Sequence, residues 1–151
     1  MPYVDPAKFT PQFAWKKLSN GAGREIFCEG VALEEIASRF GTPAYVYSQR
    51  AIEDAFDELK SGLRRLPHLL CFAVKANGNL SILNLLAKRG SGFDIVSGGE
   101  LEHLAHIAVP GNHIVFSGVG KTREEIRAAA RRLLDRHGPG SQVTSGVTTL
   151  S

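Results

Sequence analysis

Lys75 is the residue whose setting in the sequence most suggests chemistry. It ends the apolar run at residues 69–74 and precedes an Asn-Gly turn, in the stretch LLCFAVKANGN. A short apolar run without alternation is typical of a strand buried on both faces, so we expect Lys75 at the end of a central strand. Most strand-end lysines simply point into water, and the position alone leaves both interpretations open.

Asp94 is a second candidate, because it lies inside another apolar segment at residues 93–97. A carboxylate in a buried strand is costly unless a cation or hydrogen-bond donors pair with it, and Lys75 is a candidate partner. A partly desolvated amine loses its proton more readily, and a nearby carboxylate can handle protons. The two residue types together suit imine chemistry.

Strand and helix patterns alternate along the middle of the chain and would position these residues. Strands separated by single helices pair in parallel through right-handed crossovers, so residues 42–136 are predicted to form an α/β structure. The last helix starts with a capping-box spacing from Thr122 to Glu125. We expect about four βα units, with strands at 44–48, 69–74, 93–97 and 113–117 and helices at 49–65, 81–89, 100–108 and 122–136.

Two α/β folds fit this alternation. A doubly wound sheet is complete with four or five strands, whereas a (β/α)8 barrel needs eight units and roughly 250 residues. With 151 residues in the chain, length alone favours the sheet. In either fold the carboxyl ends of the strands converge on one face, where Lys75, Ser97 and the loop at 118–121 are expected together.

The two ends of the chain differ from this middle part. Residues 1–41 are expected to form an N-terminal extension with a strand within 22–32 and a short helix at 33–40. The predicted α/β domain covers residues 42–136. Residues 137–151 lose all apolar periodicity and are expected to be a flexible tail.

Composition and charge argue against several classes of partner. The formal net charge is +3, and the basic residues cluster only in pairs, so no nucleic-acid partner is expected. No apolar run has the length of a membrane span, and the proline-broken N-terminus lacks a signal core, so the expected location is the cytoplasm. Cys28 and Cys71 have no ligand-like spacing and are expected as reduced thiols.

Two further patterns are weaker. The stretch VFSGVGKT ends like a phosphate-binding loop, but Val115 stands where such a loop requires its first glycine. A nucleotide-binding loop is therefore not expected, and a small glycine-lined anion site is the remaining alternative. Glu100, His103 and His106 are spaced by three on one predicted helix, as metal ligands can be. No further ligand signature accompanies them, and no metal is expected.

Four segments carry a family resemblance: YVYSQRAIEDAFDEL, CFAVKANGN, GSGFDIVSGGEL and IVFSGVGKTREEI. Together, and in this order, they resemble the pyridoxal-phosphate-dependent decarboxylases built on an alanine-racemase-like barrel, and among these the diaminopimelate decarboxylases. The match covers about residues 14–130. It implies a partial (β/α)8 TIM-type barrel, preceded by an N-terminal strand that in the family joins a β-rich second domain.

The resemblance also implies a cofactor, pyridoxal 5'-phosphate, and roles for four residues. Lys75 would hold the cofactor covalently, Asp94 and Glu100 would lie beside it as catalytic support, and Ser97 would line the pocket. The implied reaction removes one carboxylate of a small amino acid, meso-diaminopimelate, and gives L-lysine. Full-length members of the family are expected to be homodimers.

Members of that family are much longer than this chain. Their phosphate contacts and substrate-reading residues have no counterpart in the 151 residues, so the chain is expected to be an N-terminal portion that is inactive alone. Two alternatives stay open. One is a decarboxylase of the same class for ornithine, arginine or carboxynorspermidine, and the other is a protein that binds the cofactor without turnover.

Overall fold

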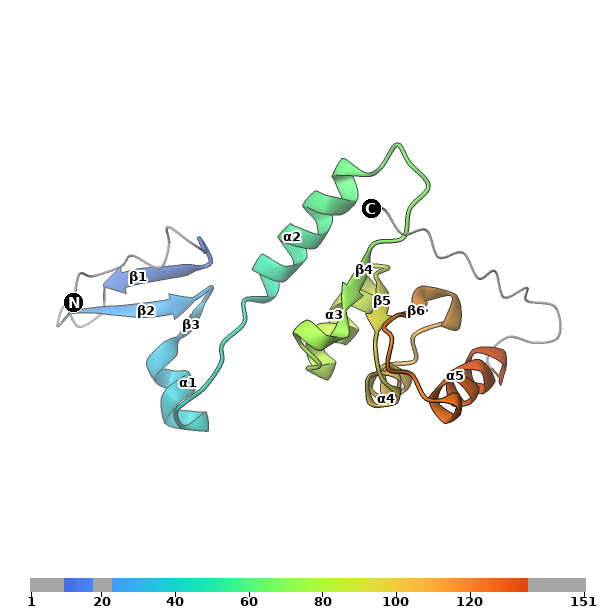
Figure 1. Cartoon of the computed structure of the whole chain (residues 1–151). Helices are drawn as coiled ribbons and strands as arrows, with labels where there is room; N and C mark the ends of the chain where they lie inside the picture. The colour runs from blue at the N-terminus through green and yellow to red at the C-terminus, as the bar shows by residue number, and fades with distance from the viewer. Residues whose placement is uncertain (1–9, 18–22, 136–151) are drawn as a thin grey trace. The chain divides into compact units, whose positions relative to one another are not determined.

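The computed structural model describes residues 10–17 and 23–135, and its chain divides into two units (Figure 1). The first unit is Met1–Arg65 and the second is Leu66–Ser151. Within the described residues no helix is both long and apolar enough to cross a membrane. The tail expected at 137–151 lies outside the described residues.

The first unit starts with a small antiparallel sheet in the order β1-β2-β3. The β1 strand at Phe13–Lys17 pairs with β2 at Arg24–Cys28, and β2 pairs with β3 at Val31–Ala32. Helix α1 follows at Leu33–Phe40, with the bounds that the sequence predicts. The strand expected within 22–32 is thus two strands joined by a reversal.

Glu29 makes that reversal and also fixes the start of helix α2 at Gln49–Gly62. Its φ angle is 55°, which lies in the left-handed region that side chains disfavour. Its Oε1 accepts hydrogen bonds from the Ser48 hydroxyl at 2.7 Å and from the Arg50 N–H at 3.0 Å. Ser48 in turn accepts from the Ala51 N–H at 3.0 Å, so α2 begins with two side-chain caps.

The second unit is built on a parallel sheet in the order β4-β5-β6, and a helix follows each strand (Figure 1). This alternation of parallel strands and helices confirms the predicted α/β fold class. A short helical turn, η2 at Val74–Ala76, follows β4, and η3 at Gly111–His113 precedes β6. The strands and helices are β4 at Cys71–Ala73, α3 at Leu80–Lys88, β5 at Gly92–Ile95, α4 at Gly98–His106, β6 at Ile114–Phe116 and α5 at Arg123–Asp135.

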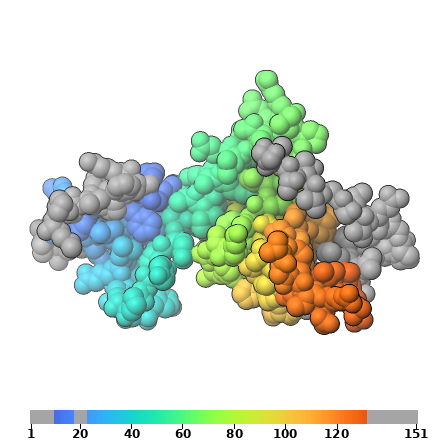
Figure 2. All heavy atoms as spheres, viewed as in Figure 1, coloured from blue at the N-terminus to red at the C-terminus, as the bar shows by residue number. Residues whose placement is uncertain are grey.

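The two faces of this sheet have different chemistry. Phe93 and Ile95 of β5 are fully buried and lie on one face, which belongs to the hydrophobic core. The helices α3, α4 and α5 pack in succession (Figure 2) and add apolar side chains to that core. The other face carries the ladder row Ala73, Asp94 and Val115. Core side chains of the unit include Val74, Ile82, Leu83, Leu86, Leu101 and Leu104.

The strand expected at residues 44–48 is wrong. Ser48 has extended dihedral angles, but within the described part of the chain these residues join no ladder. Tyr45 is 91% exposed. An alternating apolar pattern predicts extended backbone, but a β-strand also needs a neighbour to pair with. Three of the four expected strands are therefore present as a parallel sheet.

Candidate functional site

Lys75 lies in the turn that directly follows β4. The turn η2 holds Val74, which is 2% exposed, and the Asn77 N–H closes it by donating to the Val74 carbonyl at 3.1 Å. Lys75 itself is exposed. A buried residue therefore anchors the backbone while the next residue presents its amine to the outside.

The Asn-Gly-Asn segment after Lys75 fixes the other side of this turn. Asn79 caps helix α3, because its Oδ1 accepts from the Ser81 N–H at 2.9 Å. Asn77 Oδ1 accepts from the Asn79 N–H at 3.0 Å. Gly78 passes close to α4, since an added Cβ would lie 3.2 Å from His103 Nδ1. The lysine is thus held between two ordered anchors.

Asp94 occupies the row of the ladder closest to Lys75. It pairs with Ala73 of β4, which precedes Lys75 by two residues, and with Val115 of β6. Its Oδ1 is buried and has no hydrogen-bond partner. Among the described residues no hydrogen bond or ion pair joins it to Lys75, so the direct pairing expected from the sequence is absent.

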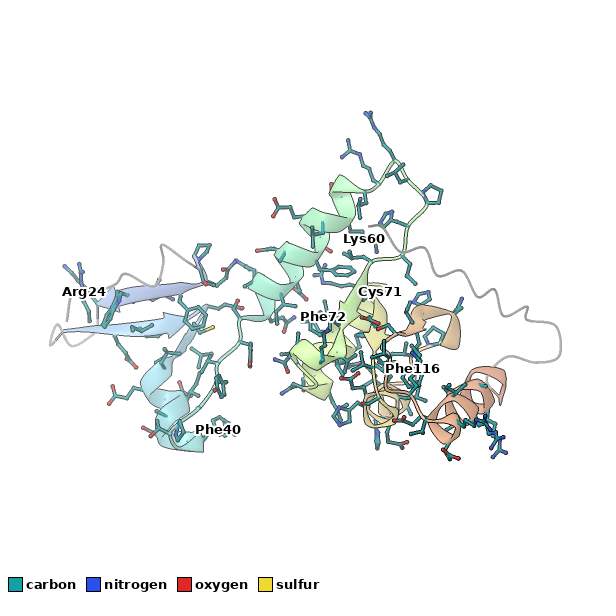
Figure 3. The ribbon with its side chains drawn as sticks, viewed as in Figure 1. Arg24, Phe40, Lys60, Cys71, Phe72 and Phe116 are labelled. Carbon is teal, nitrogen blue, oxygen red and sulfur yellow. The ribbon has the colours of Figure 1, made fainter. Side chains whose placement is uncertain are left out.

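Cys71 shares the strand face with Asp94. Figure 3 labels Cys71 and Phe72, which are neighbours on β4. Adjacent strand residues point to opposite faces, so Cys71 lies on the same face as Ala73, the ladder partner of Asp94. Burial raises the pKa of the Cys71 thiol, and the nearby negative charge of Asp94 raises it further. On this face of the sheet, the Asp94 carboxylate therefore lies where water has little access.

Ser97 and Glu100 hold the start of helix α4. The Ser97 hydroxyl accepts from the Glu100 N–H at 3.3 Å, and Glu100 Oε2 accepts from the Val96 N–H at 2.6 Å. Both predicted site residues therefore order the backbone that leaves β5. Whether they also contact a cofactor stays a prediction.

Lys121 turns back onto the end of β6. Its Nζ donates to the Ser117 carbonyl at 2.9 Å and to the Gly118 carbonyl. It also lies 5.4 Å from the ring centroid of Phe116, which Figure 3 labels. Its charge is thus bonded to two backbone carbonyl oxygens at the start of the glycine loop. The contacts of Lys121 give no support to the small anion site left open by the sequence.

The capping box predicted at the start of α5 is present, and it does more than expected. Thr122 Oγ1 accepts from the Glu125 N–H at 3.1 Å, and Glu125 Oε2 accepts from the Thr122 N–H at 2.9 Å. Glu125 Oε1 also accepts from the Gly98 N–H at 2.9 Å. The spacing of the motif contains no signal for this second bond, which depends on the tertiary structure.

The helix positions considered for metal ligands do not converge. His106 Nδ1 lies 2.8 Å from the Glu102 carbonyl, and His103 lies against Gly78. In the part of the chain that the structure describes, no group of three or more His, Cys, Asp or Glu side chains could hold a metal ion.

A comparison with family models decides the relationship of this chain. The model described as the pyridoxal-binding domain of pyridoxal-dependent decarboxylases matches residues 49–136. The chain belongs to the pyridoxal-dependent decarboxylase family. The resemblance found in the four sequence segments is confirmed, and pyridoxal phosphate is the cofactor that this family uses.

Individual members of the decarboxylase family show the same relationship. A diaminopimelate decarboxylase of Pseudomonas fluorescens is 58% identical over 110 residues, which are 73% of this chain and 26% of that protein. The crystal structure of diaminopimelate decarboxylase from M. jannaschii with L-lysine matches with a TM-score of 0.68 and 36% identity, covering 78% of this chain and 27% of that one. The Helicobacter pylori enzyme with L-lysine matches with a TM-score of 0.64 and 41% identity, covering 68% and 26%.

These decarboxylases have the barrel fold, so the β4-β5-β6 sheet is part of a (β/α)8 barrel. The doubly wound sheet that chain length favours is wrong. This chain spans about a quarter of the length of the curated relatives it matches. Length is a poor guide here because a barrel segment shows the same βα alternation as a complete sheet.

The residues present fit the cofactor of the family. An exposed lysine amine can bind the aldehyde of pyridoxal phosphate. The buried and unpartnered Oδ1 of Asp94, in the adjacent ladder row, offers an acceptor that the protein itself does not satisfy. An acceptor of this kind needs a donor or a cation, and a bound cofactor or substrate can supply one.

Proposed function

We propose that this chain forms the lysine-bearing segment of a pyridoxal-phosphate-dependent decarboxylase that converts meso-diaminopimelate to L-lysine in lysine biosynthesis. The observation that carries the proposal is the position of Lys75, exposed after β4 and two residues beyond the ladder partner of Asp94. The 58% identity to a diaminopimelate decarboxylase supports this substrate.

Lys75 holds the cofactor in this proposal. The Lys75 amine would hold pyridoxal phosphate through the aldehyde of that cofactor. The anchoring of Val74 in the core and the capping by Asn79 restrict the backbone on both sides of the lysine. Restricting that backbone lowers the entropy lost when the amine is held in place.

Asp94 contributes charge at the same end of the sheet. Its Oδ1 is already desolvated, so a cation or donor brought to it interacts in surroundings of low dielectric constant. When bound, pyridoxal phosphate supplies a ring that accepts the electron pair left on the substrate as carbon dioxide departs. Glu100 and Ser97 support this end of the site by ordering the backbone between β5 and α4.

Substrate, assembly and location follow from the same proposal. The two solved relatives are complexes with L-lysine, and L-lysine is the product of the proposed reaction. A decarboxylase of the same class for ornithine, arginine or carboxynorspermidine stays the alternative, because the substrate-reading residues of the family have no counterpart in this chain. We expect a homodimer in the cytoplasm, as for a biosynthetic enzyme.

A chimeric enzyme tests the proposal. The matching quarter of the Pseudomonas fluorescens relative is replaced by this chain's 110-residue match, with Lys75 intact or changed to Ala. We expect the intact chimera to release carbon dioxide from meso-diaminopimelate and Lys75→Ala to lose the activity. Lys88→Ala serves as the matched lysine control. A chimera that turns over equally well without Lys75 would refute the proposal.

A further inference from the structure

Glu125 joins the two loops that follow β5 and β6. Its Oε1 accepts from the Gly98 N–H at 2.9 Å, and its Oε2 accepts from the Thr122 N–H at 2.9 Å and from the Thr122 hydroxyl at 3.2 Å. Gly98 is the first residue of α4 and directly follows Ser97, the N-cap of that helix. One carboxylate therefore ties the start of α4 to the start of α5.

The bond to Gly98 is not needed for the capping box. In a capping box the third residue of the helix reaches back to the N-cap N–H, which here is the Thr122 N–H. The Gly98 bond instead spans 27 residues of sequence and brings a negative charge to the N-terminus of α4, where the helix dipole favours it. The bonds from Thr122 and then from Gly98 lower the pKa of Glu125, so the carboxylate is ionised at neutral pH.

The packing at Gly98 supports a specific contact. A Cβ added at Gly98 would lie 3.3 Å from Cγ and 3.4 Å from Oε1 of Glu125. A Cβ added at Gly99 would meet nothing closer than Ser97 Oγ at 3.9 Å. The carboxylate thus lies directly against one glycine of the pair and leaves space at the other.

We propose that Glu125 is a positioning residue that fixes Ser97 and the first turn of α4 at the cofactor end of the sheet. Ser97 and Glu100 are bonded to each other within this turn, so a shift of Gly98 moves both. Asp94 lies three residues before Ser97 on the same segment. The inference rests on the proposed function, because this position affects chemistry only if pyridoxal phosphate binds beside Lys75.

Glu125→Gln separates the two bonds of the carboxylate. The amide has a single acceptor oxygen, so it can accept on one side only, and its NH2 group would face an N–H donor on the other side. Glutamine is accepted in capping boxes, so we expect it to keep the Thr122 bond and lose the Gly98 bond. Glu124→Gln is the matched control, since Glu124 is exposed in the same helical turn.

The first readout is the Gly98 amide in nuclear magnetic resonance spectra of the full chain without cofactor. In the wild type and in Glu124→Gln, the Gly98 shift should titrate below pH 4.5, the ordinary pKa of Glu125. In Glu125→Gln this titration should be lost. A Gly98 shift that titrates identically in all three proteins would overturn the inference.

The second readout is the affinity of the full chain for pyridoxal phosphate, measured by absorbance. Loss of one hydrogen bond should weaken binding about fivefold in Glu125→Gln and in Gly98→Ala, with Glu124→Gln and Gly99→Ala unchanged. Equal affinity in Glu125→Gln and wild type would overturn the positioning role. If the chain alone binds no cofactor, the same variants are compared in the chimeric enzyme, where equal affinity in Glu125→Gln and in the unchanged chimera would overturn the positioning role. The Gly98 titration upholds or overturns the link between the loops in either case.

Discussion

Ala73 of β4 and Asp94 of β5 are ladder partners in the parallel sheet, and Lys75 follows Ala73 by two residues. A carboxylate oxygen without a partner is therefore buried one strand away from an exposed amine. This relationship requires Asp94 to lower the stability of the free protein, since burying an unsatisfied polar atom is costly.

Replacing Asp94 by Ala should stabilise the second unit and weaken cofactor binding. We expect the free energy of opening at the Phe93 and Ile95 amides to rise by about 1 kcal/mol, because the unsatisfied acceptor is removed. Hydrogen exchange of these amides measures the stability, and absorbance measures the binding. Lower stability with unchanged binding would remove Asp94 from the candidate site.

Gly92 should not tolerate a side chain. A Cβ there would lie 2.6 Å from Cys71 Sγ and 2.9 Å from Leu69 Cδ2, so Gly92→Ala should destabilise the second unit by about 1–3 kcal/mol. Cys71→Ala removes the nearer atom. Combining the two changes should recover part of the loss, which a double-mutant cycle on amide exchange detects. Additive effects would show that Cys71 is not the obstacle.

Glu29 should make the first unit sensitive to acid. Bonds from Ser48 and then from Arg50 lower its pKa from the ordinary value of 4.5, so the folded state binds fewer protons than the unfolded state. The stabilisation is present above 4.5 and is lost as the pH falls through the lowered pKa. In Glu29→Gln, the stability deficit relative to wild type should therefore shrink at low pH.

Urea unfolding followed by the fluorescence of Trp15, which is the single tryptophan and lies on β1, measures this effect. Glu35→Gln is the control, because Glu35 is an exposed residue of α1 in the same unit. A deficit in Glu29→Gln that is equally large at about pH 3 and pH 7 would contradict the role of its charge.

Lys121 should support the end of β6 without affecting the cofactor. Its ammonium bonds to the Ser117 and Gly118 carbonyls, so Lys121→Met should cost about 1 kcal/mol of stability in the second unit. Affinity for pyridoxal phosphate should not change. A clear loss of affinity at unchanged stability would mean that Lys121 binds the phosphate after all.

Local patterns predicted the elements that depend on local interactions. Helix α1 at Leu33–Phe40 and the capping box at Thr122 follow from apolar periodicity and from side-chain caps within a few residues. The strands around Lys75 and Asp94 were found from their apolar runs, although only β5 is largely buried and the residues of β4 are half-buried.

Features that depend on distant partners could not be predicted. Residues 44–48 have a strand-like pattern but join no ladder among the described residues. The strand β1 at Phe13–Lys17 was not predicted, because it forms through its pairing with β2 and not through a pattern of its own. The bond from Gly98 to Glu125 joins two loops, and no spacing rule encodes it. The unpartnered Oδ1 of Asp94 became visible only when the surrounding donors were known.

The central claim is that Lys75 is the residue that binds pyridoxal phosphate. Incubating the full chain with pyridoxal phosphate, reducing with borohydride and mapping the peptides tests it most directly. We expect the label on Lys75, its loss in Lys75→Arg, which keeps the charge, and its retention in Lys88→Arg. A label on another lysine with Lys75 unmodified would contradict the claim.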